Sequence, residues 1–143
     1  SDGTPWRPVI HIKDVCNALL AGLEAPKKII NGNAYNIGYE NGNFSVRELA
    51  EAAARSIKGS KLVFTEEHPD SRTYKVSFKR IFRELGDWFK PKWDLDKGAN
   101  ELVSNFEKIN FNEEIFRGIL TNRLLKLKDL KNTNKIAGDL RWK

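Results

Sequence analysis

The sequence predicts an α/β protein, because segments typical of strands alternate along the chain with segments typical of helices. Short β-branched or apolar runs occupy residues 6–12, 34–38 and 61–65, and stretches with apolar residues at helical spacing follow them. Three short strands are few for a parallel sheet covered by helices on both faces. We therefore expect the back part of a larger α/β fold.

The first two elements are a strand and a helix. The strand is expected over 6–12, and Asp14 follows it as the expected N-cap of the helix. Pro26 ends that helix, because proline cannot continue the backbone hydrogen-bond pattern. The expected buried side of the helix is formed by Val15, Leu19 and Leu23.

The clearest helix of the sequence begins at Ser45. Ser45 and Glu48 are spaced as a capping box, in which the serine oxygen accepts from the backbone N–H three residues on and the glutamate reaches back. Gly59 is the expected end of this helix. Its expected apolar side is formed by Val46, Leu49, Ala50, Ala53, Ala54 and Ile57.

Three further helices bring the expected number to about five. The first carries Phe78 to Leu85 and stops at Gly86, and the second is capped by Asp94 and extends to about residue 106. The third begins at about 112 or 113 and is broken at 132–134. Its apolar stripe consists of Ile115, Phe116, Ile119, Leu120, Leu124, Leu127 and Leu130.

Composition limits the class of protein. The chain has 143 residues, of which 40% are apolar, and its net charge is +6. No apolar run approaches the roughly 20 residues of a membrane span, and the first residues lack a signal-peptide pattern. The single cysteine, Cys16, excludes an internal disulfide and favours a reducing compartment. We expect a cytoplasmic protein, or a piece of one, with no membrane partner.

The positive charge is concentrated at the end of the chain. Residues 107–143 hold nine basic and five acidic side chains, whereas residues 1–106 hold sixteen and fourteen. We therefore expect two parts, a main part over 1–106 and a basic helical extension over 107–143.

No motif supports independent catalysis or metal binding. The two histidines, His11 and His68, lie far apart, and the sequence contains neither a phosphate-binding glycine motif nor a Gly-x-Ser-x-Gly motif. His11 is expected to be a packed or hydrogen-bonded residue, and Asp14 a cap rather than a base. We expect no catalytic residue and no metal site in this chain.

Two arginines are candidates for phosphate binding. Arg7 lies at the start of the first strand, and Arg72 lies in a polar loop two residues before Tyr74. Arginine presents a rigid fork that matches phosphate oxygens bidentately, so two arginines on separate segments could clamp a diphosphate. The ordinary alternative is a solvated surface arginine or a local ion pair, such as Asp70 with Arg72. Spacing alone favours that alternative.

Five segments, in order, resemble nucleotide-sugar epimerases and dehydratases of the extended short-chain dehydrogenase/reductase superfamily. The resemblance extends over about residues 2–106. Val9 replaces an aromatic residue that many members have, and residues 87–91 form a longer link than usual. The matching segments are Arg7–Val15, Tyr35–Gly38, Phe44–Ala50, Asp70–Ser77 with Lys79 and 84–86, and Leu95–Gly98 with Glu101-Leu102.

The resemblance is to the C-terminal part of such an enzyme. The family's glycine-rich NAD-binding loop and its tyrosine-xxx-lysine pair lie in the front half of the chain. Here Tyr35, Tyr39 and Tyr74 all lack a lysine four residues later. The resemblance thus implies an incomplete Rossmann-type fold, a substrate-binding part without the main cofactor and catalytic region. The N-terminal Rossmann domain becomes an expected partner, and a homodimer is possible.

The resemblance also implies a function for the candidate residues. Arg7 and Arg72 match the arginines that contact the diphosphate of a nucleotide-diphosphate sugar, and Tyr74 lies beside the same pocket. The intact enzyme would use NAD(P), and this chain alone would bind none and would not turn over substrate.

Two other classes of function remain as alternatives. The pI near 9.5 and the basic tail fit a nucleic-acid-binding module, although acidic residues are interleaved and no nucleic-acid motif is present. We therefore expect no nucleic-acid partner. The apolar stripe of 115–130 fits a helical protein-interaction module, and docking on the absent domain is the favoured version of that alternative.

Overall fold

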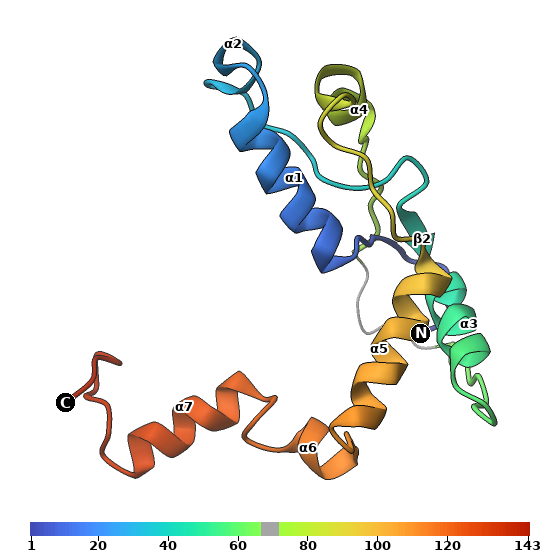
Figure 1. Ribbon diagram of the computed structural model, residues 1–143. Coiled ribbons are helices and arrows are strands. Elements are labelled where there is room, and N and C mark those ends of the chain that lie inside the picture. The colour runs from blue at the N-terminus through green and yellow to red at the C-terminus, as the bar shows by residue number, and fades with distance from the viewer. Residues whose placement is uncertain (67–71) are drawn as a thin grey trace. The chain divides into compact units, whose positions relative to one another are not determined.

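The computed structural model describes residues 1–66 and 72–143 (Figure 1). The chain forms two compact units, Ser1–Val103 and Ser104–Lys143. Both strands belong to the first unit. The functional division expected between residues 106 and 107 stays a prediction.

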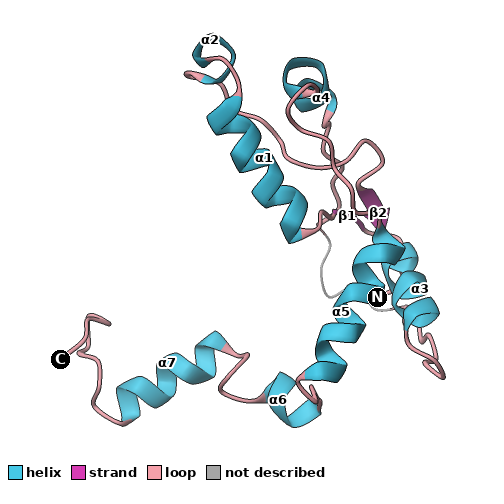
Figure 2. Ribbon diagram, in the orientation of Figure 1, coloured by secondary structure: helices cyan, strands magenta, loops and turns pink. Residues whose placement is uncertain are grey.

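Within the described residues the chain forms seven helices and two short strands (Figure 2). The mixed α/β composition is confirmed, but the expected number of about five helices is too low. One additional short helix follows Pro26, and the last expected helix is two helices. The elements in order are β1 Trp6–Pro8, α1 Ile12–Glu24, α2 Lys27–Ile30, β2 Asn43–Ser45, α3 Val46–Ser56, α4 Lys79–Leu85, α5 Leu95–Lys108, α6 Glu113–Arg117 and α7 Arg123–Asn132.

The sheet consists of β1 and β2, which pair antiparallel with Arg7 opposite Phe44. The predictions of strands over 34–38 and 61–65 are wrong, because neither of these segments, both described by the structure, forms a strand. The first strand ends at Pro8 instead of residue 12. A strand exists only where a neighbour completes its hydrogen-bond ladder. Segment 34–38 is held by side chains instead: the Ala34 carbonyl accepts from Arg80.

The cap of α1 is His11, and the prediction that Asp14 caps this helix is wrong. The Nδ1 atom of His11 accepts from the backbone N–H of Lys13 at 3.2 Å. Asp14 lies in the first turn and is fully buried, where its carboxylate accepts from the backbone N–H groups of Lys92 and Trp93 at 3.0–3.1 Å. A buried carboxylate requires donors, and the 92–93 backbone supplies them.

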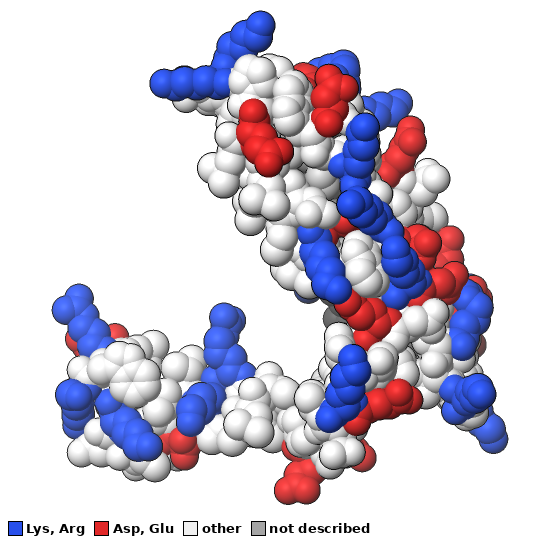
Figure 3. Space-filling model, viewed as in Figure 1, with Lys and Arg blue, Asp and Glu red and all other residues white. Residues whose placement is uncertain are grey.

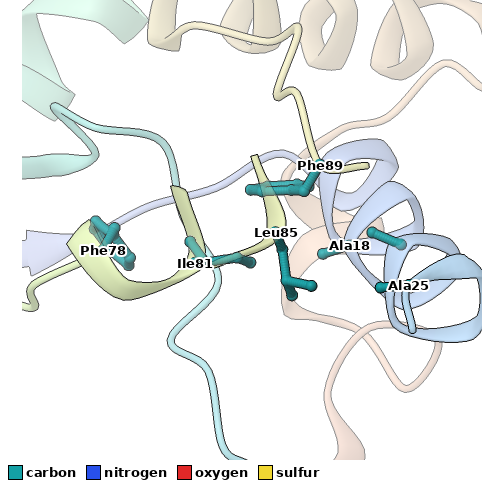
Figure 4. Close-up of a cluster of buried hydrophobic side chains, with 7 residues drawn as sticks. Ala18, Ala25, Phe78, Ile81, Leu85 and Phe89 are labelled. Carbon is teal, nitrogen blue, oxygen red and sulfur yellow. The ribbon is translucent and has the colours of Figure 1, made fainter. Parts of the chain in front are cut away.

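The buried side of α1 differs from the expected one. Leu19 and Leu23 are 61% and 83% exposed, while Ala18 and Ala21 are buried. The small alanines allow the helix to approach its neighbours closely. The core cluster that they join also contains Ala25, Phe78, Ile81, Leu85 and Phe89 (Figure 4).

Several local predictions of the first unit are confirmed, but the expected end and apolar side of α3 are wrong. The helix ends at Ser56 before reaching Gly59, and its buried residue is Ala52, whereas Ile57 is 48% exposed. Ser45 and Glu48 form the complete capping box of α3. Phe78 precedes α4 and Gly86 follows it. Asp94 accepts from the backbone N–H of Lys97 at 2.8 Å, as the expected cap of α5 does.

In the second unit the expected continuous helix is interrupted between Gly118 and Asn122. Asn112 caps α6, and Asn122 caps α7 by accepting from the N–H three residues on. These asparagines offer the backbone an N-cap geometry that competes with a continuous helix. The break expected near Asn134 is confirmed, because α7 ends at Asn132 and Asn134 has φ 59°.

Candidate functional site

Arg7 occupies the centre of β1, and its guanidinium has a defined position. The strand is half-buried. The Nη1 atom donates to the backbone carbonyls of Trp6 at 2.7 Å and Arg72 at 2.5 Å. Two carbonyl acceptors from different segments therefore orient the guanidinium.

The segment that begins at Arg72 lies against β1. The backbone N–H of Trp6 donates to the hydroxyl of Thr73 at 3.0 Å, and the N–H of Tyr74 approaches the Trp6 carbonyl at 3.5 Å. The ammonium of Lys75 lies 3.4 Å from the centre of the Trp6 indole ring. These contacts fix residues 72–75 beside the strand that carries Arg7.

Asn43 of β2 holds the other end of this segment. Its side-chain oxygen accepts from the N–H of Val76 at 2.8 Å, and its side-chain nitrogen donates to the Val76 carbonyl at 2.9 Å. The amide thus imitates a paired backbone unit. The residue type of Asn43, beside Gly42, is typical of a turn and gives no signal of a role in placing 72–76.

Arg7, Arg72 and Tyr74 are brought together by these contacts. The Tyr74 ring centre lies 5.8 Å from the Arg7 guanidinium carbon, and the Tyr74 side chain is 53% exposed. Arg72 is also exposed. The alternative ion pair of Arg72 with Asp70 lies outside the described residues.

This arrangement is chemically suited to an anion. A guanidinium oriented by backbone carbonyls, a second arginine on the adjacent segment and a phenol hydroxyl offer several donors at one edge of the small sheet. The ammonium of Lys75 adds positive charge nearby. Charge-assisted hydrogen bonds from arginine to phosphate are each worth about 1.5–3 kcal/mol.

A separate hollow of about 260 Å³ lies beside β2 and has the opposite charge. Arg55 is its one basic lining residue, whereas four carboxylates line it: Glu48, Glu51, Asp94 and Asp96. Burial, followed by the negative charges of Asp94, Asp96 and Glu48, raises the pKa of Tyr39 to about 12. The hollow would repel a diphosphate, and the Tyr39 phenol stays protonated near neutral pH.

His11 belongs to a cluster that joins the start of α1 to α5. Its ring stacks on Trp93 with centres 4.0 Å apart, and its Nε2 lies 2.5 Å from a Glu101 carboxylate oxygen. Lys13 pairs with the other oxygen of Glu101. Hydrogen bonds from Lys13 and then His11 lower the pKa of Glu101. The expectation that His11 is a packed, hydrogen-bonded residue is confirmed.

The start of α3 does not fit a dinucleotide cofactor. Such a site needs a strand that leads through a glycine-rich turn into a helix N-terminus, so that backbone N–H groups face the pyrophosphate. Here β2 leads directly into α3, and the Ser45 side chain already occupies that N-terminus. Among residues 1–66 and 72–143, no cluster of three or more His, Cys, Asp or Glu side chains could hold a metal ion.

No helix in the described part of the chain combines the length and apolar character needed to cross a bilayer.

The N-terminal part of the chain, which contains β1, α1 and α2, matches a known protein family. Residues 1–38, about a quarter of the chain, match the model of the NAD dependent epimerase/dehydratase family. This stretch contains Arg7–Val15 and Tyr35–Gly38, two of the five segments that carry the resemblance. No solved structure matches the chain. The match supports a relationship to this family of enzymes.

Proposed function

We propose that this chain is the nucleotide-diphosphate-sugar-binding portion of an NAD-dependent sugar epimerase or dehydratase of the extended short-chain dehydrogenase/reductase superfamily. In this proposal the dinucleotide-binding domain and the catalytic tyrosine lie in polypeptide outside the given sequence. The match of residues 1–38 to the NAD dependent epimerase/dehydratase family supports the proposal.

The contact between Arg7 and the Arg72 segment carries the proposal. A guanidinium on β1 is held against the carbonyl of Arg72, 65 residues further along the chain, at 2.5 Å. This contact places the Arg7 guanidinium beside the Arg72 backbone, which supports a shared role for the two arginines in binding one ligand. A diphosphate carries about two negative charges, and both arginines together could neutralise them.

The proposed roles follow from these positions. Arg7 binds a phosphate oxygen from a fixed direction, and Arg72 binds the other phosphate from the adjacent segment. Tyr74 contributes its exposed hydroxyl. Binding the diphosphate at a distance from the reacting carbon holds the sugar in place for hydride transfer to the NAD that the absent domain supplies.

Titration of this chain with UDP-glucose, inorganic pyrophosphate and uridine tests the proposal. We expect saturable binding of the two diphosphates and none of uridine, because the arginines recognise phosphate. Affinity should fall as salt rises, as for any site in which exposed charges contribute. The chain should show no turnover of UDP-glucose when NAD is added.

Substitution of the arginines identifies the binding surface. Arg7→Ala should weaken pyrophosphate binding by about tenfold or more, equivalent to about 1.4 kcal/mol. Arg123→Ala, an exposed arginine in the second unit, is the matched control and should leave the affinity unchanged. Equal losses in the two variants, or uridine binding as tight as UDP-glucose binding, would refute the proposed site.

A further inference from the structure

The last part of the second unit carries most of the chain's net charge. Residues 118–143 contain seven basic and two acidic side chains, a balance of +5, while the whole chain has +6. In Figure 3 blue side chains surround the C-terminal segment, and few red ones accompany them. Such a segment fits an acidic partner.

The same segment exposes large apolar side chains. Leu120 is 84% exposed, Leu124 is 61% exposed and Trp142 is 72% exposed. Leu125, Leu127 and Leu140 are exposed as well. Scattered exposed apolar residues are ordinary, but their concentration in a strongly basic segment indicates a surface that is covered by a partner.

The segment has a defined local structure that presents these groups. Leu130 and Ile136 are buried, and Ile136 forms an antiparallel bridge with Trp142. The N–H of Ala137 donates to the Arg141 carbonyl at 2.8 Å. The chain after α7 therefore folds back on itself with Trp142 at its end.

Within α7 the exposed apolar and basic residues share a side. Leu127 and Lys128 follow Leu124 by three and four positions, so each lies on the same face of the helix as Leu124. Lys131 follows Lys128 by three positions and extends that face. Lysine stems are apolar, so their ammonium groups can reach a charged layer while the leucines enter an apolar one.

These features favour an acidic surface over the absent domain, the occupant expected from the sequence, because charged residues and lysines are depleted where protein interfaces are buried and this segment has a balance of +5. They also distinguish between the other occupants. A second copy would bring +5 against +5, and the like charges would oppose contact. A nucleic acid would pair with the lysines but would leave the leucines in water. The surface of a bilayer that contains anionic lipids accepts both groups, since leucines enter the acyl boundary and lysines meet the headgroups. Tryptophan also favours this interfacial region.

We propose that residues 118–143 form a peripheral binding surface for membranes that contain anionic lipids, in place of the expectation of no membrane partner. In this proposal the segment lies on the surface of the bilayer and does not cross it. The proposal is independent of the diphosphate site, because the residues that carry it belong to the second unit.

Co-sedimentation of the whole chain with lipid vesicles tests the proposal. Vesicles of phosphatidylcholine with about a third phosphatidylglycerol should bind the chain at least about tenfold more tightly than vesicles of phosphatidylcholine alone. Raising the salt concentration should release the chain from the anionic vesicles. Equal binding to both kinds of vesicle, or binding that salt does not change, would overturn the proposal without any variant being needed.

Two matched pairs of variants locate the surface. K128E/K131E should weaken binding to the anionic vesicles by more than about fivefold for each lysine, the equivalent of about 1 kcal/mol. The control K27E/K28E makes the same change in the exposed lysines of α2 and should have a much smaller effect. Leu124→Gln with Leu127→Gln should also weaken binding, and Leu19→Gln with Leu23→Gln, on exposed α1 leucines, should not.

The remaining outcomes also decide the question. Circular dichroism should show that the variants keep the helical content of the parent chain. Equal losses in the α2 and α7 lysine pairs would overturn the proposal, because they would show only a response to net charge. A polyuridine RNA that binds more tightly than anionic vesicles at the same salt would assign the surface to nucleic acid instead. Concentration-dependent dimerisation abolished by Leu124→Gln with Leu127→Gln would assign it to a second copy.

Discussion

A hydrogen bond of 2.5 Å joins the Nη1 atom of Arg7 to the backbone carbonyl oxygen of Arg72. The two residues are 65 positions apart in the sequence. Because one side chain contacts the backbone of the other residue, the position of each depends on the other. Residues that hold the Arg72 segment in place should therefore influence the arginine surface from a distance.

Asn43→Ala should loosen the segment from 72 to 76. The variant removes both hydrogen bonds to the Val76 backbone, and we expect the Val76 N–H to exchange with solvent at least tenfold faster, which corresponds to about 1.4 kcal/mol. Pyrophosphate affinity should fall as well. Asn41→Ala, in the same turn but exposed, is the control. Unchanged exchange at Val76 in Asn43→Ala would contradict this role.

Asp14→Ala should destabilise the first unit. The substitution leaves the N–H groups of Lys92 and Trp93 without the carboxylate that accepts from them, and each unsatisfied buried donor costs about 1–3 kcal/mol. Urea unfolding measures the loss. Asp14→Asn keeps one acceptor oxygen and should lose less, and the exposed Asp87→Ala should change little. Similar unfolding midpoints for Asp14→Ala and Asp87→Ala would show that the contact contributes nothing.

Two glycines with different surroundings should respond oppositely to alanine. Gly38 is buried against the Phe78 ring, and an added Cβ would overlap that ring. Gly38→Ala should therefore destabilise by about 1–3 kcal/mol, as overpacking does. Gly22 lies within α1 with open space around it, so Gly22→Ala should stabilise by up to about 1 kcal/mol. Thermal unfolding of both variants checks the opposite signs.

Stability at low pH should depend on Glu84. Hydrogen bonds from Arg83, Tyr35 and Arg80 lower the pKa of this carboxyl from 4.5 to about 2. A carboxylate with a lowered pKa contributes stability above its ordinary pKa and loses it as the pH falls toward the folded value. Between pH 4.5 and 2 the free energy of unfolding should thus decline more steeply in the parent chain than in Glu84→Gln.

The same pH series needs a control at an exposed glutamate. Glu40→Gln, in a loop of the same unit, should keep the parent's slope. Parallel curves for the parent and Glu84→Gln over that range would mean that the contacts around Glu84 do not hold in solution.

The local signals in the sequence were reliable where a few neighbouring residues decide the structure. The capping box of Ser45 and Glu48 is complete, and Asp94 accepts from the N–H of Lys97. Both depend on hydrogen bonds within four residues. Short-range chemistry of this kind can be read from residue types alone.

The errors occurred where distant contacts decide the structure. Asp14 has the residue type of an N-cap, yet its oxygens accept from Lys92 and Trp93, nearly eighty residues away. The prediction of the buried side of α1 was wrong because alanines, not leucines, face the core residues. Hydrophobic spacing identifies a helix but does not show which neighbour covers each side.

The candidate site was predicted in part. Residue types indicated Arg7 and Arg72, and the family resemblance added Tyr74. The structure brings the Arg7 guanidinium beside the Arg72 carbonyl and the Tyr74 ring. The residues that position them, Asn43 and Trp6, gave no signal that could be recognised, because their partners are backbone atoms and a lysine far along the chain. The binding role of Arg7, Arg72 and Tyr74 stays a prediction.

The most direct test of the proposed function is the kinetics of the intact epimerase or dehydratase to which the proposal assigns this chain. Arg7→Ala and Arg72→Ala should each raise KM for the nucleotide sugar by about tenfold or more, while kcat changes much less, because the arginines bind the diphosphate and not the reacting carbon. Unchanged KM in both variants would show that these arginines do not hold the substrate.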